Sequence, residues 1–200
     1  MAYIFQSIAD KGSAQGITPN QTSEARGWYR DQASQLTSRN VSTNRLMNDK
    51  KNVVPSLVVR DIGSMFMFFY DPKTKDSLPY YDIFPLIFLI GFKENGFMGI
   101  NLHYLPQYLR AKLMDALYST ANNNKYDDST KLKISYQILN NAAQFKYFEP
   151  CLKRYLWDHV QGGQFLKVEP KNWDTALMLP TERFKKATKS TVFKDSSRGF

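Results

Sequence analysis

The stretch IFPLIFLIGFKENGFMGINLHY, residues 83–104, predicts two strands joined by a turn. The apolar run Ile83–Ile90 is too short for a typical helix and is interrupted by Pro85, so we expect a strand that is buried on both faces. Glu94-Asn95-Gly96 is a turn signal, and Phe97–Tyr104 follows with the composition of a second strand. An antiparallel hairpin is therefore expected at the centre of the fold.

The segment before this hairpin extends the expected sheet. Val53–Val59 and Met65–Tyr70 are rich in β-branched, aromatic and methionine residues, a composition that favours strands. Asp71–Asp76 is polar and contains Pro72, which suits a corner of a turn. Three or four strands joined by short turns predict a small curled antiparallel sheet or barrel.

The segment after the hairpin carries apolar residues at four-residue spacing, which predicts helices over residues 106–121, 129–143 and 150–163. A short strand, Phe165–Val168, follows. The fold class expected is thus α+β, with the sheet followed by a helical region. The third helix would end at Gly162-Gly163, and its apolar stripe would consist of Leu152, Leu156 and Val160.

The first 52 residues contain two short helix candidates separated by a polar linker, residues 12–23. Thr22 or Ser23 would cap the second helix, which carries Trp28 and Tyr29. A segment this polar buries too little apolar surface to fold alone. We therefore expect three regions: a partly helical, extended N-terminal arm (1–52), a core α+β domain (53–180) and a basic C-terminal tail (181–200).

The charge of the chain follows the same division. Its 200 residues carry a net charge of +9, with a net +4 over residues 1–60, −1 over 61–120 and +6 over 121–200. No run approaches the roughly 18 apolar residues of a membrane span, and the N-terminus lacks the pattern of a signal peptide. We expect a soluble, basic, non-secreted protein that has no membrane partner.

Few residues carry the signature of a reaction. The single cysteine, Cys151, excludes an internal disulfide and a cysteine-based zinc site, and no glycine-rich phosphate loop is present. Glu169-Pro170-Lys171 matches the Glu-x-Lys pattern of metal-dependent nucleases, although Pro170 would interrupt the supporting strand. We expect no catalytic residues, no cofactor, no metal and no small-molecule substrate, and keep the nuclease as a minor alternative.

Nucleic-acid binding is favoured by the charge and by aromatic residues interleaved with it. Stacking platforms combine such rings with cations that follow a phosphate backbone. The same cations would equally suit acidic protein neighbours. The candidate contacts in the tail are Lys185, Lys186, Lys189, Lys194 and Arg198. Further candidates are Lys125, Lys131, Lys133, Lys146, Lys153 and Arg154, with the aromatic residues Tyr147, Phe148 and Tyr155.

The middle of the chain resembles a block found in small virion proteins of T-even-type contractile-tailed phages and their marine relatives. The resemblance is carried by residues 66–75, 78–86 and 96–106, and continues through 110–113 towards 179–184. Such families supply baseplate, hub and neck subunits and proteins that protect the packaged DNA end. The resemblance implies assembly rather than catalysis.

The function expected is that of a non-enzymatic structural subunit of such a virion, in the tail or baseplate region. The alternative is a protein of the same particle that binds and protects the DNA end. Its partners would be other virion proteins and, in the alternative, DNA. The resemblance also implies a virion protein that is made in the host cytoplasm. Large aromatic and basic side chains are the expected contacts with those partners, namely Trp28, Tyr29, Arg39, Arg45, Tyr80 and Tyr81. For Trp28 and Tyr29, packing in the core is an equal alternative.

Overall fold

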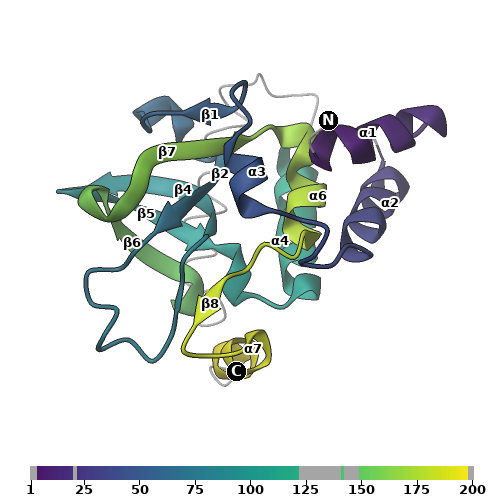
Figure 1. Ribbon diagram of the computed structural model, residues 1–200. Coiled ribbons are helices and arrows are strands. Elements are labelled where there is room, and N and C mark those ends of the chain that lie inside the picture. The colour runs from purple at the N-terminus through teal and green to yellow at the C-terminus, as the bar shows by residue number, and fades with distance from the viewer. Residues whose placement is uncertain (1–3, 20–21, 122–140, 142–148, 198–200) are drawn as a thin grey trace.

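A six-stranded antiparallel sheet occupies the centre of the computed structural model, which describes residues 4–19, 22–121, 141 and 149–197 (Figure 1). Its strand order is β1-β7-β2-β4-β5-β6, and a second sheet pairs β3 with β8. The strands are β1 (Val53–Val54), β2 (Met65–Tyr70), β3 (Tyr81–Asp82), β4 (Leu86–Lys93), β5 (Gly96–Asn101), β6 (Leu152–Leu156), β7 (Val160–Val168) and β8 (Phe184–Lys185). The helices are α1 (Ile4–Ala14), α2 (Ser23–Ser34), α3 (Thr43–Met47), α4 (Gln107–Ala121), α6 (Trp173–Met178) and α7 (Lys189–Ser197).

The hairpin expected from residues 83–104 is confirmed as β4 and β5. β4 begins at Leu86 rather than Ile83 because Pro85 has no backbone N–H to donate to a ladder. β5 ends at Asn101, whose side chain accepts the backbone N–H of His103 at 3.0 Å and caps a short 3₁₀ turn. The hairpin is therefore the core of the sheet, with shorter strands than the apolar run suggests.

Both faces of the sheet are buried. In β2, Met65 and Met67 belong to one hydrophobic cluster, and Phe66 and Phe68 belong to another. Successive side chains of a strand point to opposite faces, so the two clusters lie on the two sides of the sheet. The first cluster packs under the helices, where Phe88 meets Trp173 at 5.2 Å between ring centroids. The second lies inside the curl of the sheet.

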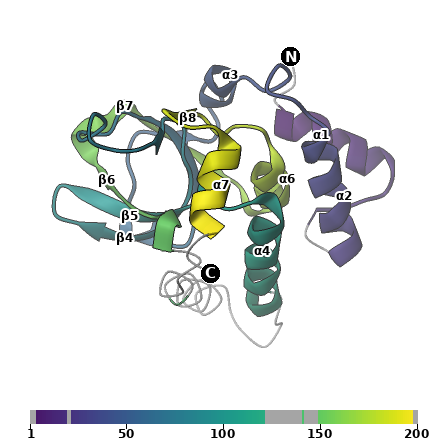
Figure 2. The same ribbon diagram turned by 90° about the horizontal axis from the view of Figure 1, so that it is seen from below.

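The sheet curls strongly without closing (Figure 2). Within the described part of the chain its edge strands, β1 and β6, are not paired with each other. The inner cluster instead joins β2, β4, β5, β6 and β7 through aromatic contacts, with Phe68 at 5.1 Å from Tyr155 and 5.2 Å from Phe165. The expected α+β class with a curled antiparallel sheet is confirmed. The sheet is open, so the alternative of a barrel is not confirmed.

The helix expected over residues 150–163 is wrong. The chain there forms β6, a 3₁₀ turn at Trp157–His159 and the start of β7. A spacing of four is also a multiple of two, so the stripe Leu152, Leu156, Val160 fits one face of a strand as well as one face of a helix. Gly162 and Gly163, with φ of 71° and 57°, stand within β7 rather than at the end of a helix.

Other expected elements are confirmed in part. The helix after Pro106 is α4, and the expected short strand Phe165–Val168 is the last part of β7. The expected strand Val53–Val59 is limited to β1, since Pro55 follows directly and cannot donate a ladder hydrogen bond. The helix expected over 129–143 lies outside the described residues, apart from position 141.

The N-terminal helices pack on the helical side of the fold, with α2 against α6 and α1 against α2. Phe5 and Ile8 of α1 and Tyr29 of α2 belong to the same cluster as Met65 and Phe88. Thr22 caps α2 as expected, accepting the backbone N–H of Ala25 at 3.1 Å. The division at residues 52 and 180 stays a prediction.

An ion-pair cluster fastens α2 to the core. Arg30 contacts Asp174 of α6 at 2.6 Å and Asp115 of α4 at 2.7 Å. Burial raises the pKa of Asp174, and the nearby Arg30 opposes this rise. The charge on Arg30 thus compensates a carboxylate that is 1 % exposed.

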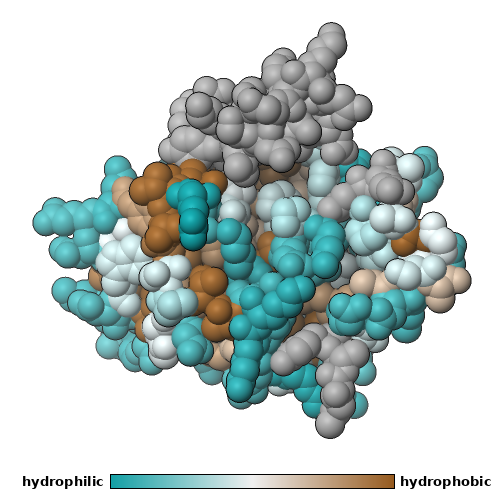
Figure 3. All heavy atoms as spheres, turned by 90° about the horizontal axis from the view of Figure 1, so that it is seen from above, coloured by the Kyte–Doolittle hydropathy of each residue, from teal (hydrophilic) through white to brown (hydrophobic). Residues whose placement is uncertain are grey.

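The surface seen from above is mostly hydrophilic, with hydrophobic residues gathered on one side (Figure 3). Val58 and Val59 are 42 % and 74 % exposed.

Among the helices that the structure describes, none combines the length and the apolar character needed to cross a membrane.

Candidate functional site

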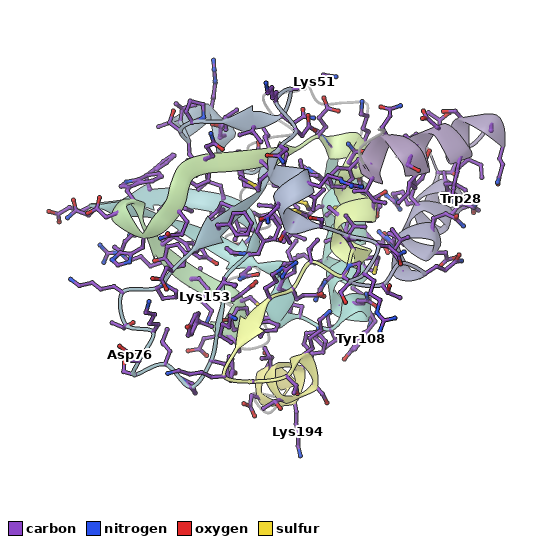
Figure 4. The ribbon with its side chains drawn as sticks, viewed as in Figure 1. Trp28, Lys51, Asp76, Tyr108, Lys153 and Lys194 are labelled. Atoms are coloured by element: carbon purple, nitrogen blue, oxygen red, sulfur yellow. The ribbon has the colours of Figure 1, made fainter. Side chains whose placement is uncertain are left out.

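A pocket of about 410 Å³ opens between the loop that follows β2 and the edge strand β6. One wall is formed by Pro72, Lys73, Thr74 and Leu78, and the other by Lys153–Leu156. In Figure 4, Asp76 marks the loop and Lys153 marks β6. We call this cavity the tyrosine pocket, because it is lined by Tyr70, Tyr80, Tyr81, Tyr104 and Tyr155.

The rings of the tyrosine pocket are packed against one another. Tyr80 and Tyr104 lie 6.1 Å apart between centroids, and Tyr70 and Tyr155 lie 4.9 Å apart. Burial raises the pKa of Tyr80, Tyr104 and Tyr155, so their hydroxyl groups stay protonated and act as donors at neutral pH. The Oη of Tyr155 is enclosed, and the side chain of Asn101 opposes the rise in its pKa.

Lys153 brings a positive charge into this pocket. Its Nζ lies 4.2 Å from the centroid of the Tyr104 ring, a cation–π geometry. Burial lowers the pKa of Lys153, because the charged form is the one that loses hydration. Within the described part of the chain no carboxylate comes within 4.0 Å of it. The pocket therefore holds a partly desolvated cation whose charge the protein leaves uncompensated.

Lys186 holds the outer wall of the pocket in place. Its ammonium donates to the backbone carbonyls of Lys75, Asp76 and Leu78 at 2.7, 2.9 and 3.2 Å. Lys75 in turn pairs with Asp71 at 2.7 Å. The loop is thus fastened to the segment after β8.

The base of the pocket is a buried polar network centred on Asp82. One carboxylate oxygen accepts the backbone N–H groups of Phe84 and Arg183 at 3.0 and 3.2 Å. The other contacts Asn101 Nδ2 at 3.2 Å and His103 Nδ1 at 2.7 Å. This carboxylate joins β3, the end of β5 and the chain just before β8.

Asp82, His103 and Thr181 are arranged like the acid, base and nucleophile of a catalytic triad. His103 Nε2 lies 3.1 Å from Thr181 Oγ1. Yet the three residues are 4 %, 0 % and 1 % exposed. A nucleophile must reach its substrate, and this hydroxyl is enclosed. The arrangement is consistent with structural support for the pocket.

A second buried network surrounds Arg110, which is 0 % exposed. Its guanidinium donates to the carbonyls of Leu105, Leu177 and His103 at 2.8, 2.8 and 3.3 Å. It also pairs with Glu182 at 2.7 Å, and Lys189 pairs with the other oxygen of that carboxylate. This network joins α4, α6 and the chain around β8.

We expect the stability of the protein to depend on Glu182 in acid. Burial opposes ionisation of Glu182, but His103, Arg110 and Lys189 outweigh it and lower the pKa from 4.5 to about 2. A depressed folded-state pKa contributes stability that is complete above 4.5 and is lost as the pH falls towards 2. The contribution is on the order of 3 kcal/mol.

The measurement is the free energy of unfolding of the wild type and of Glu182→Gln between pH 7 and pH 2. The difference between the two proteins should be largest above pH 4.5 and should shrink as the wild-type carboxyl is protonated. A difference that stays constant over this range would contradict the assignment.

The expected site residues separate into two groups. Tyr80, Tyr81, Lys153, Arg154 and Tyr155 meet in the tyrosine pocket, although residues 80 and 153 are far apart in sequence. The Arg154 guanidinium is turned to the carbonyl of Glu94 at 2.8 Å.

The other expected residues lie elsewhere. Tyr29 is 3 % exposed and donates to the Ile17 carbonyl at 3.1 Å, so its place is in the core, while Trp28 is partly exposed. Arg39 and Arg45 are exposed near α3.

Among the tail residues, Lys185 and Lys194 are exposed, and Lys194 points away from the fold in Figure 4. Lys186 and Lys189 are bound to the protein itself. Outside the described residues are Lys125, Lys131, Lys133, Lys146, Tyr147, Phe148 and Arg198.

The partners of Glu169 that the described residues show are two lysines. Glu169 contacts Lys171 at 2.9 Å and Lys51 at 3.9 Å. Asp158 lies at the opposite end of β7. Over the described ranges there is no group of three or more His, Cys, Asp or Glu residues suited to a metal ion.

The family comparison agrees with the resemblance seen in the sequence. The model of the phage T4 terminal DNA protecting protein family matches residues 13–196. No curated protein and no solved structure matches the chain. This match favours the expected alternative, a DNA-end protector, and gives no support to a tail or baseplate role. The chain therefore belongs to the phage T4 terminal DNA protecting protein family.

Proposed function

We propose that this protein binds the ends of linear double-stranded DNA in a phage virion and shields them from exonucleases. The family match supports an action on DNA ends. The observation that carries the proposal in this chain is the tyrosine pocket, in which Lys153 stands uncompensated among aromatic rings. Cations beside stacking surfaces are the chemistry with which proteins hold the backbone and bases of an exposed strand.

The shape of the pocket favours an end over the side of a duplex. A cavity of about 410 Å³ has the size of a site for one small ligand. A duplex presents its bases only through grooves that an α-helix or a β-ribbon enters. A strand terminus can enter the cavity, whereas continuous duplex cannot.

Two further surfaces complete the proposal. The exposed Lys185 and Lys194 lie outside the pocket and would add electrostatic attraction to the adjacent duplex. Trp28, which is partly exposed on α2, and the exposed Arg39 and Arg45 would contact other virion proteins. Both roles are separate from the capture of the end.

The test compares a labelled duplex with open ends to the same duplex closed at both ends by hairpin loops, using fluorescence anisotropy at several salt concentrations. The wild type should bind the open duplex at least about tenfold more tightly. The double variant Lys73→Met/Lys153→Met should lose most of this preference and should lower the slope of log K against log salt by about one or two.

The matched control is Lys50→Met/Lys51→Met, which removes the same charge at exposed positions near α3 and β1. In Figure 4, Lys51 lies at the top of the fold, well apart from Lys153 on β6. This control should retain the preference for open ends. Equal affinity of the wild type for open and closed duplexes would overturn the proposed function.

A further inference from the structure

We infer that the tyrosine pocket takes a single terminal nucleotide, unpaired from its partner strand and carrying a terminal phosphate, so that the protein recognises a frayed end. This inference rests on the proposed function and specifies the chemical unit that is bound. It follows from three observations: the size of the pocket, the accessible stacking ring and the uncompensated cation.

The pocket has space for one nucleotide rather than for a base pair. Its volume of about 410 Å³ is bounded by the loop wall and by β6, and a pocket of this class encloses most of the surface of one small ligand. A paired terminal base carries its partner and the second strand with it. Entry into the pocket therefore requires that the terminal pair be opened, as in enzymes that extract a base from the stack.

Tyr80 supplies the surface on which the base stacks. Its ring lies against Tyr104 at an interplanar angle of 36°, and its side chain is partly exposed on the pocket. Tyr104 is 4 % exposed and is backed by Phe184 at 5.2 Å. Tyr104 thus supports Tyr80 from behind. Base–aromatic stacking tolerates any base, because every base has a π-face, which suits ends of differing sequence.

Lys153 supplies the site for the phosphate. Among the cations that line the pocket, Lys73 and Arg154 are exposed, whereas Lys153 is partly buried and has no carboxylate within 4.0 Å among the described residues. A phosphate beside Lys153 would restore the charge balance that burial disturbs. On the same strand Leu156 donates its backbone N–H outward to Tyr70 Oη at 3.1 Å. The two-residue repeat of a strand points the N–H of Arg154 to the same free edge, which adds a donor beside Lys153.

The experiment uses the full-length protein and duplexes that are closed at one end by a hairpin. Three kinds of second end are compared: a fully paired end, an end mismatched at its last pair, and an end closed by a second hairpin. Each open end is prepared in three forms, which carry a 5′-phosphate, a 3′-phosphate or hydroxyl groups only. The wild type should bind a mismatched end about tenfold more tightly than a paired one, because no pair has to be opened. Removing the terminal phosphate should lower its affinity about tenfold.

The variants assign these effects to residues. Lys153→Met should bind phosphorylated and unphosphorylated ends equally, and Tyr80→Leu should lose the preference for mismatched ends. Tyr80→Phe keeps the ring and should keep the preference. Lys51→Met, which removes a charge outside the pocket, should behave as the wild type in every arm. Whether the 5′- or the 3′-phosphate restores binding identifies the strand that enters.

The outcomes distinguish the two proposals. Tighter binding to open than to closed ends, with no effect of mismatch or terminal phosphate, overturns the inference and leaves the proposed function standing. Equal binding to open and closed ends overturns the proposed function itself.

Discussion

Arg110→Met is expected to lower the free energy of unfolding by about 3–5 kcal/mol, the usual cost of breaking a buried ion pair by removing one partner. The side chain is 0 % exposed and makes four hydrogen bonds, three to carbonyls and one to Glu182. Methionine fills much of the volume but leaves these acceptors buried without donors. Since domains are stable by only about 5–15 kcal/mol, much of the variant is expected to be unfolded at moderate denaturant.

Urea titration followed by circular dichroism measures this effect. Arg110→Lys keeps the charge but cannot reproduce the planar fork of donors, so it should fall between the wild type and Arg110→Met. Arg60→Met, at an exposed position, is the control and should unfold within about 0.5 kcal/mol of the wild type. An Arg110→Met variant with wild-type stability would contradict the role assigned to this network.

Asp82→Asn is expected to cost about 3 kcal/mol and to weaken binding of DNA ends. Four donors converge on the two oxygens of this carboxylate. An asparagine side chain has one acceptor oxygen and an NH₂ group with two donors. In the variant this NH₂ group would point at donors that bind a carboxylate oxygen in the wild type. Because Asp82 lies at the base of the tyrosine pocket and joins β3 to β5, its loss should also displace the pocket walls.

The two effects of Asp82→Asn are measured separately, by urea unfolding and by end binding below the unfolding transition. Asp76→Asn removes a charge from the exposed part of the loop and should change neither quantity appreciably. Stability lost without any change in end binding would show that the pocket does not depend on this network.

The sheet was predictable where burial leaves a pattern in the sequence. Residues 83–90 are apolar at every position but Pro85, and the part of this run from Leu86 onward belongs to β4, which is covered on both sides. Helix α2 was predictable from its cap at Thr22. The structure of residues 150–163 was not predictable, because apolar residues spaced four apart fit one face of a strand as well as one face of a helix.

The site was predictable only in its components. Lys153, Arg154 and Tyr155 stand out as a basic and aromatic cluster, and Tyr80 and Tyr81 as large amphipathic rings. What joins them is the antiparallel pairing of β5 with β6, which aligns Gly99 with Lys153. No local pattern in the sequence predicts which strands pair with each other.

The networks beneath the pocket left no signal that charge or hydropathy could detect. Lys186 belongs to a basic run typical of a solvated tail, yet its ammonium holds three carbonyls of the loop. Arg110 occupies a helix position that would suit an exposed arginine. Only the tertiary fold shows that both side chains bind backbone carbonyls of segments distant in sequence.

The central ladder of the sheet also determines how this chain reaches its native state. β2 pairs with β7, so that Met65 is aligned with Val168, and β1 pairs with the same strand. More than half of the chain therefore separates the partners. Contacts between residues so far apart in sequence must overcome a large loop-closure entropy before they stabilise the folded chain. Proteins dominated by such contacts fold in milliseconds to seconds rather than in microseconds. The β4–β5 hairpin, whose strands are joined by a short turn, closes a much smaller loop, so we expect it to form before β2 pairs with β7.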